Sequence, residues 1–107
     1  MQAALDAIAE PRRRAILRLV RYEELASGRI ASEFEVTPQA ISQHLRVLRE
    51  AGLVSERRDG TRRLYRARPE PVAELGRFLE HFWDSGLERL KAEAEREERR
   101  NESAADR

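Results

Sequence analysis

The segment 37–53 constrains the fold more than any other part of the chain, because it carries its own helix start and stop signals. Thr37 can cap a helix N-terminus through its hydroxyl, and Pro38 suits the first helical position, where no backbone N–H is needed. Gly52 suits the left-handed residue that follows a helix. The sequence therefore predicts a short helix over residues 37–51.

The two faces of this helix differ in their chemistry. Ile41, Leu45 and Leu48 recur at the spacing i, i+4, i+7, so one face is apolar. The opposite face is polar and free of acids, with Gln39, Ser42, Gln43 and Arg46. Such a helix fits the major groove of DNA, where amide and guanidinium groups can read base edges. An ordinary amphipathic surface helix shows the same pattern, so the rest of the chain must decide between these interpretations.

Length and composition favour a single domain with a modest core, since the chain has 107 residues. No apolar run approaches the roughly 20 residues that span a bilayer, and the first ten residues do not resemble a secretory signal. We therefore expect a soluble, cytoplasmic protein without membrane contact. The chain has no cysteine, which excludes disulfides and thiolate metal sites.

The net charge of +1 conceals an uneven distribution. Residues 1–68 carry a net charge of +5, and residues 69–107 carry −4. Residues 37–68 hold eight arginines and three acids, which equals the whole excess of the first part. A basic block beside an acidic one is typical of a half that binds a polyanion and a half with another role.

The N-terminal third predicts short helices over residues 2–9, 11–22 and 27–34. The third of these, a tight link, and the helix from residue 37 together make a helix-turn-helix pattern. Three arginines at positions 12–14 occupy a first helical turn, where the helix dipole disfavours cations. They therefore need compensation from acids such as Glu10, or a partner elsewhere.

An Asp-Gly dipeptide predicts a β-hairpin after the helix-turn-helix. We favour a three-residue loop over 58–60, because it sets Val54 opposite Leu64 and Glu56 opposite Arg62. That register gives one apolar face and one pair of opposite charges.

The resulting wing, residues 55–66, has a dense positive tip. Its arginines are Arg57, Arg58, Arg62 and Arg63. In one interpretation the hairpin is solvated and its arginines serve solubility. In the other they contact an anionic partner, because like charges so close together repel unless an anion approaches them.

A long helix is predicted from Val72 to at least Glu93, after two prolines end the hairpin. Its apolar residues alternate spacings of three and four, as in a coiled coil. A domain this small can hardly cover such a stripe, so we expect a twofold dimer through this helix and the first one, although the helix could instead pack wholly on its own domain. The predicted interface residues are Leu5, Ile8, Val72, Leu75, Leu79, Phe82, Trp83 and Leu90.

We expect residues 1–92 to form the DNA-binding and dimerisation domain, and residues 93–107 a charged extension. This extension either continues the helix through i,i+4 pairs or frays.

Three segments of the chain resemble a known family: residues 5–17, 40–54 and 59–65. The first has a proline followed by paired arginines and Ile-Leu, the second is very like a recognition helix with its following strand, and the third resembles a wing. Together they are similar to the ArsR/SmtB family of bacterial transcriptional regulators. The resemblance implies a mainly α fold with a small β-hairpin, a winged helix-turn-helix with a long C-terminal dimerisation helix.

The family resemblance also implies a homodimer that binds double-stranded DNA at an inverted-repeat operator, usually as a repressor. Two recognition helices about 34 Å apart would enter successive major grooves. By position, the groove or base-edge contacts are Gln39, Ser42, Gln43 and Arg46. Thr37 is expected to touch a phosphate, and the wing residues Arg58, Arg62 and Arg63 to touch phosphates or the minor groove.

Metal sensing is common in the family, but this sequence departs from its ligand patterns. Residues 24–29 hold no cysteine, and the last helix offers only His81 and Asp84, whereas Zn²⁺ takes three or four ligands. We therefore expect no metal and no cofactor, as in the metal-free branch of the family. His44 lies at the flank of the helix, so we expect it to pack or to bond backbone there, and favour this over the alternative of a phosphate contact.

The competing interpretations are a winged-helix module that binds another protein, and an enzyme. The first would use the same fold without DNA. The second lacks support, because two separate histidines and no Gly-rich phosphate loop cannot assemble a catalytic site.

Overall fold

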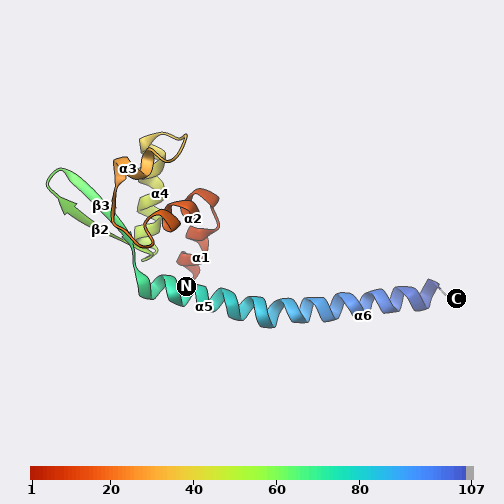
Figure 1. Cartoon of the computed structure of the whole chain (residues 1–107). Coiled ribbons are helices and arrows are strands. Elements are labelled where there is room, and N and C mark those ends of the chain that lie inside the picture. The colour runs from red at the N-terminus through yellow and green to blue at the C-terminus, as the bar shows by residue number, and fades with distance from the viewer. Residues whose placement is uncertain (106–107) are drawn as a thin grey trace. The chain divides into compact units, whose positions relative to one another are not determined.

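The computed structural model describes residues 1–105 of the chain, and it is mainly helical with one small sheet (Figure 1). The chain forms two compact units, and the boundary between them lies within the fifth helix, after Leu75. The elements are α1 (Gln2–Ile8), α2 (Pro11–Leu19), β1 (Leu25–Ala26), α3 (Ser27–Ala31), α4 (Pro38–Glu50), β2 (Val54–Asp59), β3 (Arg62–Ala67), α5 (Pro69–His81), the π-helix η1 (Phe82–Gly86) and α6 (Leu87–Ala105). This architecture confirms the predicted fold class, a winged helix-turn-helix with a long C-terminal helical segment.

Helix α4 forms as its local signals predict. The Thr37 hydroxyl accepts a hydrogen bond from Ala40 N at 3.1 Å, which caps the helix start. At the other end Gly52 adopts φ +78, and Leu53 N donates to Leu48 O at 3.0 Å. This is a Schellman ending, in which a left-handed glycine lets the chain turn back and satisfy the last carbonyl groups.

The core of the first unit lies between the helices and the sheet. The predicted apolar face of α4 is buried, and Ile16, Ile30 and Leu53 from other elements pack in the same cluster. Each fully buried side chain of this kind contributes about 1.5–3 kcal/mol relative to leaving it exposed. Helix α3 ends at Ala31, earlier than predicted, and α2 ends at Leu19.

The arginines at the start of α2 have partners in α1. Arg13 Nε donates to Ala7 O at 2.5 Å, and Arg14 Nη1 donates to Ile8 O at 2.7 Å. Both guanidinium groups therefore bond carbonyl groups at the C-terminal end of α1, where the dipole favours cations. Glu10 also compensates them, because its carboxylate caps α2 and accepts from Arg13 N at 2.9 Å.

The predicted register of the wing is wrong. Strands β2 and β3 join through a two-residue turn, residues 60–61, and pair Val54 with Ala67 rather than with Leu64. Gly60 takes φ +63, while Thr61, like the other non-glycine residues that the structure describes, does not have a positive φ. This is the pattern of a type II′ turn, whose twist matches that of a hairpin.

A third strand explains why the register argument failed. The sheet has the order β1-β3-β2 and is antiparallel, and Leu25 of β1 lies opposite Tyr65 of β3. Neighbouring strand residues point to opposite faces of a sheet. Strand β3 pairs along both edges, and it also buries side chains on both faces: Leu64 is 6% exposed and Tyr65 is 7% exposed. The prediction had assumed that only one face was apolar.

The second unit continues α5 through η1 into α6. The helical segment begins at Pro69, since proline is tolerated in a first turn. The expected uninterrupted helix is interrupted by the π-helix, where Ser85 Oγ donates to His81 O at 2.6 Å. A π-turn inserts extra backbone and so rotates the side chains that follow it, which breaks the predicted coiled-coil spacing.

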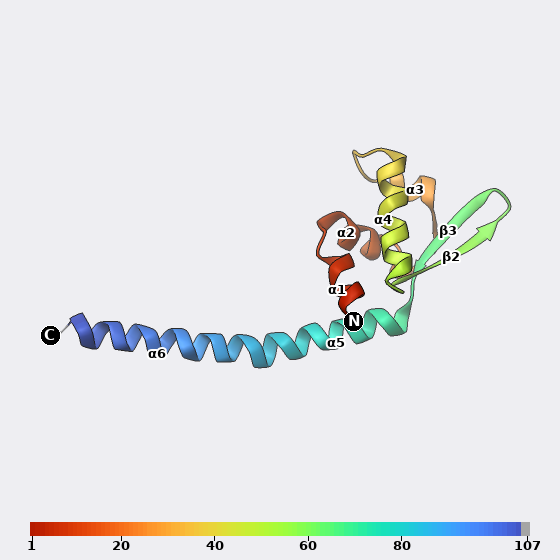
Figure 2. The same ribbon diagram turned by 180° about the vertical axis from the view of Figure 1, so that it is seen from behind.

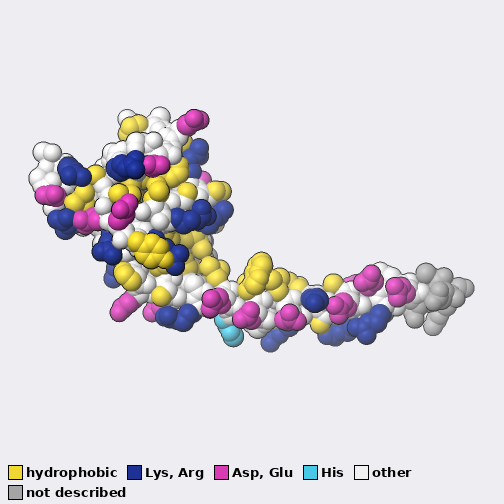
Figure 3. All heavy atoms as spheres, in the orientation of Figure 1, with side chains coloured by type: hydrophobic (Ala, Val, Ile, Leu, Met, Phe, Trp, Pro, Cys, Tyr) yellow, Lys and Arg dark blue, Asp and Glu magenta, His cyan; other side chains and the backbone are white. Residues whose placement is uncertain are grey.

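Apolar side chains gather in a patch on one side of the second unit, while charged side chains line its whole length (Figure 3). The exposed apolar residues lie around η1 and just after it: Phe78, Leu79, Phe82, Trp83 and Leu90. From residue 93 onward, α6 carries almost only charged, small or polar side chains. Across the described residues, no helix is both long enough and apolar enough to cross a membrane.

Candidate nucleic-acid interface

A groove of about 570 Å³ runs between the outer face of α4 and strand β3 of the wing. Figures 1 and 2 show the β2–β3 hairpin reaching away from the helices beside α4. The groove is lined by Ser27, Pro38, Gln39, Ser42, Gln43, Arg46, Arg49, Arg63 and Tyr65. Its lining thus combines hydrogen-bonding amides and hydroxyls with three arginines and no acid.

Sequence-predicted DNA contacts fall into two groups. The four from the α4 face line the groove, and Arg63 of the wing faces them. Thr37 lies exposed at the start of α4, with its hydroxyl engaged in the cap. The remaining wing residues, Arg58 and Arg62, are exposed near the hairpin turn and do not line the groove.

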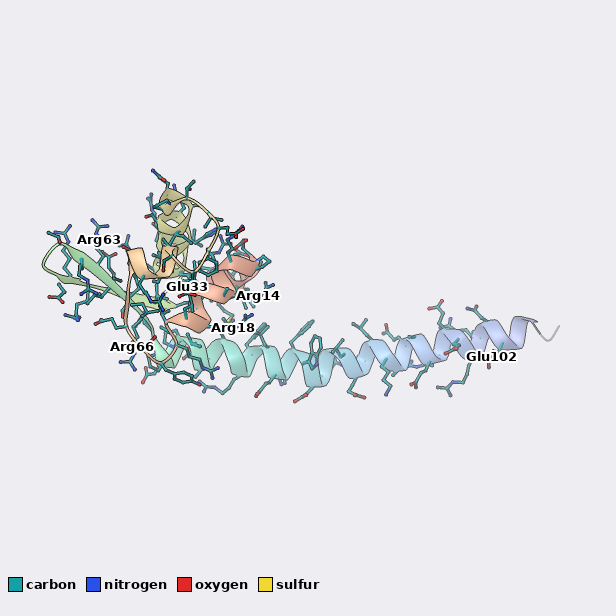
Figure 4. The ribbon with its side chains drawn as sticks, turned by 45° about the horizontal axis from the view of Figure 1, so that its top comes forward. Arg14, Arg18, Glu33, Arg63, Arg66 and Glu102 are labelled. Carbon is teal, nitrogen blue, oxygen red and sulfur yellow. The ribbon has the colours of Figure 1, made fainter. Side chains whose placement is uncertain are left out.

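The hairpin register assigns the wing arginines to different faces. Arg58 lies directly opposite Arg63, so these two share one face of the hairpin with Tyr65. Arg62 lies opposite Asp59 and therefore points to the other face. Figure 4 shows Arg63 on the outer part of the hairpin.

Four residues of the groove lining were not predicted as DNA contacts from the sequence: Ser27, Pro38, Arg49 and Tyr65. Arg49 follows Arg46 by three positions, so helical periodicity alone would have placed it on the same face. Tyr65 and Ser27 carried no comparable signal, because their places depend on the pairing of β1 with β3.

The groove arginines are held by acids from outside the groove. Arg46 Nε lies 3.1 Å from Glu50 Oε1, one turn along α4. Glu56 of β2 forms an ion pair with Arg49, and its other oxygen lies 3.7 Å from Arg63 Nε. Burial raises the pKa of the Tyr65 phenol and the nearby Glu56 carboxylate raises it further, against a smaller opposing effect of Arg63.

On the other face of the hairpin, Arg57 is joined to Glu24. Its Nη2 lies 2.6 Å from Glu24 Oε1, and its Nε donates to the second carboxylate oxygen at 3.1 Å. This hydrogen bond holds the pKa of Glu24 below its usual value and raises that of Arg57. Glu24 precedes β1, so the pair ties the wing to the body of the unit outside the groove.

His44 lies away from the groove, as the helical angles predicted. Its Nδ1 is 3.4 Å from Arg13 Nη1 and 3.9 Å from Glu10 Oε2, so it packs at the junction of α1 and α2. Burial raises the pKa of Glu10, but hydrogen bonds from the backbone N–H groups of Arg13 and Arg12 and the positive groups nearby together outweigh it and leave the pKa below its usual value. The contact links α4 to the N-terminal helices.

The residues predicted to form the dimer interface differ in their solvent exposure. Leu75 is only 4% exposed and packs in the core of the first unit, with Val72, Leu5 and Ile8 partly buried against the same core. The others lie exposed on the second unit, together with Phe78, which the sequence-based list omitted. Their role in a dimer stays a prediction.

The described residues bring together no group of three or more His, Cys, Asp or Glu side chains that could hold a metal ion. The groove itself is lined by hydrogen-bond donors and amides, and metal-ligating carboxylates are missing from its lining.

The capped helix, the groove and the hairpin define a winged helix-turn-helix protein. A family model described as "Bacterial regulatory protein, arsR family" matches residues 10–56. The HTH-type transcriptional regulator Rv2034 of Mycobacterium tuberculosis is 42% identical over 84 residues, or 78% of each chain. The chain belongs to the ArsR family of transcriptional regulators, whose members are DNA-binding proteins and not enzymes.

Two further matches agree with this membership. The transcriptional repressor SdpR of Bacillus subtilis is 37% identical over 60 residues, which cover 56% of this chain and 67% of the repressor. The crystal structure of a possible transcriptional regulator for arsenical resistance has a TM-score of 0.74 and 43% identity, and the match covers 84% of this chain and 94% of that one.

Proposed function

We propose that the protein is a homodimeric, cytoplasmic repressor that recognises an inverted-repeat operator through the groove. Helix α4 enters the major groove, where Gln39, Ser42, Gln43 and Arg46 meet base edges. The wing follows the backbone, where Arg58, Arg62 and Arg63 meet phosphates or the minor groove. The observation that carries this proposal is the acid-free lining of the groove, in which side chains that read bases lie beside arginines.

The repressor role and the dimer rest on further support. SdpR is a repressor by name, and it is 37% identical to this chain over 60 residues. The exposed aromatic residues of the second unit offer an apolar surface that a second copy could cover, and a twofold dimer would present two α4 helices to one duplex. Residues 1–92 would then form the DNA-binding and dimerisation domain, and residues 93–107 a charged extension.

Selection of duplexes from a random pool, followed by footprinting, tests the proposal. We expect the full chain to enrich an inverted repeat whose half-sites lie about 10–10.5 base pairs apart, centre to centre. Affinity should fall steeply with salt, because arginines displace condensed counterions from the phosphates. Equal and weak binding to all sequences would refute specific recognition, and a monomer without DNA affinity would favour a protein-interaction module. A reporter downstream of the selected site separates repression from activation.

A further inference from the structure

Glu56 joins the recognition helix to the wing through one carboxylate. It forms an ion pair with Arg49 of α4, and its Oε1 lies 3.7 Å from Arg63 Nε on β3. The Glu56 side chain is only 16% exposed, whereas those of Arg49 and Arg63 are about half exposed, at 45% and 52%. The acid is therefore covered, and the guanidinium groups that it holds remain open to a ligand.

The position of Glu56 relative to the groove matters for its role. Arg49 and Arg63 both line the groove, but Glu56 does not. It lies directly opposite Tyr65 in the sheet, and Tyr65 is part of the lining. A guanidinium has five N–H donors, so an arginine bound to a carboxylate retains donors for a phosphate. Glu56 thus holds the two arginines from a covered position beside the groove lining.

We propose that Glu56 is a positioning residue that fixes Arg49 and Arg63 relative to each other across the groove. This inference rests on the proposed function, since it concerns how that groove binds DNA. A fixed pair of phosphate-binding arginines holds α4 in one register, and base contacts are made only in that register. The negative charge of Glu56 meanwhile weakens the attraction to any phosphate backbone. Glu56 therefore lowers affinity for DNA in general and raises discrimination between sequences.

The chain supplies a matched control in Glu24. It also joins a wing arginine to the body of the unit, but its partner Arg57 lies on the opposite face of the hairpin and neither residue lines the groove. Glu24→Gln and Glu56→Gln remove the same charge and keep nearly the same side-chain volume. A difference between the two variants then reports the position of the lost ion pair and not the change in net charge.

The experiment measures binding of the full chain to the duplex that it selects and to a scrambled duplex, at several salt concentrations. We expect Glu24→Gln to tighten both complexes by a similar factor, so that the ratio of the two affinities is unchanged. Glu56→Gln should also tighten the scrambled complex, but the ratio should fall about tenfold, as for one mismatched base pair. Equal ratios in the two variants, or a higher ratio in Glu56→Gln, would overturn the inference.

Failure of the inference is distinguishable from failure of the proposed function. If the wild-type chain selects no duplex, the proposed function fails and the inference with it. If a duplex is selected and Glu56→Gln discriminates as Glu24→Gln does, only the inference fails. Should Glu56→Gln not fold, a double-mutant cycle of Arg49→Gln and Arg63→Gln replaces it. Two arginines held by one carboxylate should affect the ratio non-additively, and additive effects would overturn the inference.

Discussion

At the residue scale, Arg46 and Arg62 carry the same charge in different settings. Arg46 lines the groove on α4, whereas Arg62 lies near the hairpin turn on the face away from the groove. We predict that Arg46→Ala lowers discrimination against single-base changes in the selected duplex by about 1–3 kcal/mol, because a base-edge contact is lost. Arg62→Ala should weaken binding to all sequences and reduce the salt slope by about one unit. Fluorescence anisotropy across a salt series measures both quantities, and identical profiles for the two variants would contradict the assignment.

Tyr65 provides a second prediction at this scale, concerning pH. Burial and the Glu56 carboxylate raise its pKa above the usual value of 10.0. A group whose pKa is raised on folding stabilises the folded state fully below its unfolded pKa, and this stability is lost as the pH rises through the folded value. We therefore expect the free energy of unfolding to decline from about pH 10 upward, and to decline less steeply in Tyr65→Phe.

Spectrophotometric titration of the phenol checks the origin of this shift. The difference between the wild type and Tyr65→Phe isolates the Tyr65 titration. Glu56→Gln should lower the pKa of Tyr65, because one of its two raising causes is removed. An unchanged pKa in Glu56→Gln would show that the Glu56 carboxylate does not contribute to the shift.

At the element scale, the end of α4 depends on a single backbone conformation. Gly52 has φ +78, and a Cβ there would meet only Arg68 Nη1 at 3.5 Å, an ordinary contact. The cost of Gly52→Ala is therefore conformational, and we predict a loss of about 1–2 kcal/mol in the free energy of unfolding. Gly28→Ala is the control, since Gly28 lies in α3 with open space around it. It should stabilise slightly, by roughly 0.4–1 kcal/mol. The measurement is the shift of the urea unfolding midpoint relative to the wild type. Shifts of equal size and sign in the two variants would contradict this account.

Elements whose signals are local could be predicted from the sequence. The cap at Thr37, the apolar spacing of α4 and the glycine after it all lie within one segment, and the structure has each of them. The wing register could not be predicted, because it depends on β1, a two-residue strand without any periodic pattern. The π-helix was missed for a related reason. Its sequence, Phe82–Gly86, continues the helical spacing, and the Ser85 hydroxyl bond to the preceding turn becomes evident only in three dimensions.

The groove shows the same division between local and distant signals. Its α4 residues follow from the helical angle, and so did the exclusion of His44. Arg49 was overlooked although periodicity allowed it, whereas Tyr65 and the Glu56 ion pairs depend on strand pairing across the sheet. The charges on α4 could therefore be predicted, but the acids that hold the groove arginines could not.

At the scale of the whole molecule, two DNA-reading helices must act together for operator binding to be tight. Linking two half-site contacts can raise affinity by 10²–10⁴ without any new contact, because the second becomes intramolecular. The exposed apolar residues of the second unit are the proposed link. Their importance for DNA binding can be tested without altering any residue of the groove.

We predict that Leu79→Glu makes the protein monomeric and weakens operator binding by at least about 100-fold, since a charge cannot be buried unpaired in an apolar interface. Tyr22→Glu is the matched control, because Tyr22 is 77% exposed in the first unit and outside the predicted interface. Light scattering gives the oligomeric state, and Trp83, the one tryptophan of the chain, reports burial through its emission. In the wild type the emission maximum should shift to longer wavelength on dilution, because the dimer dissociates. In Leu79→Glu the emission maximum should lie at the longer wavelength at every concentration. A Leu79→Glu protein that remains dimeric, or a monomer that binds the operator as tightly as Tyr22→Glu does, would refute the proposed link between dimerisation and recognition.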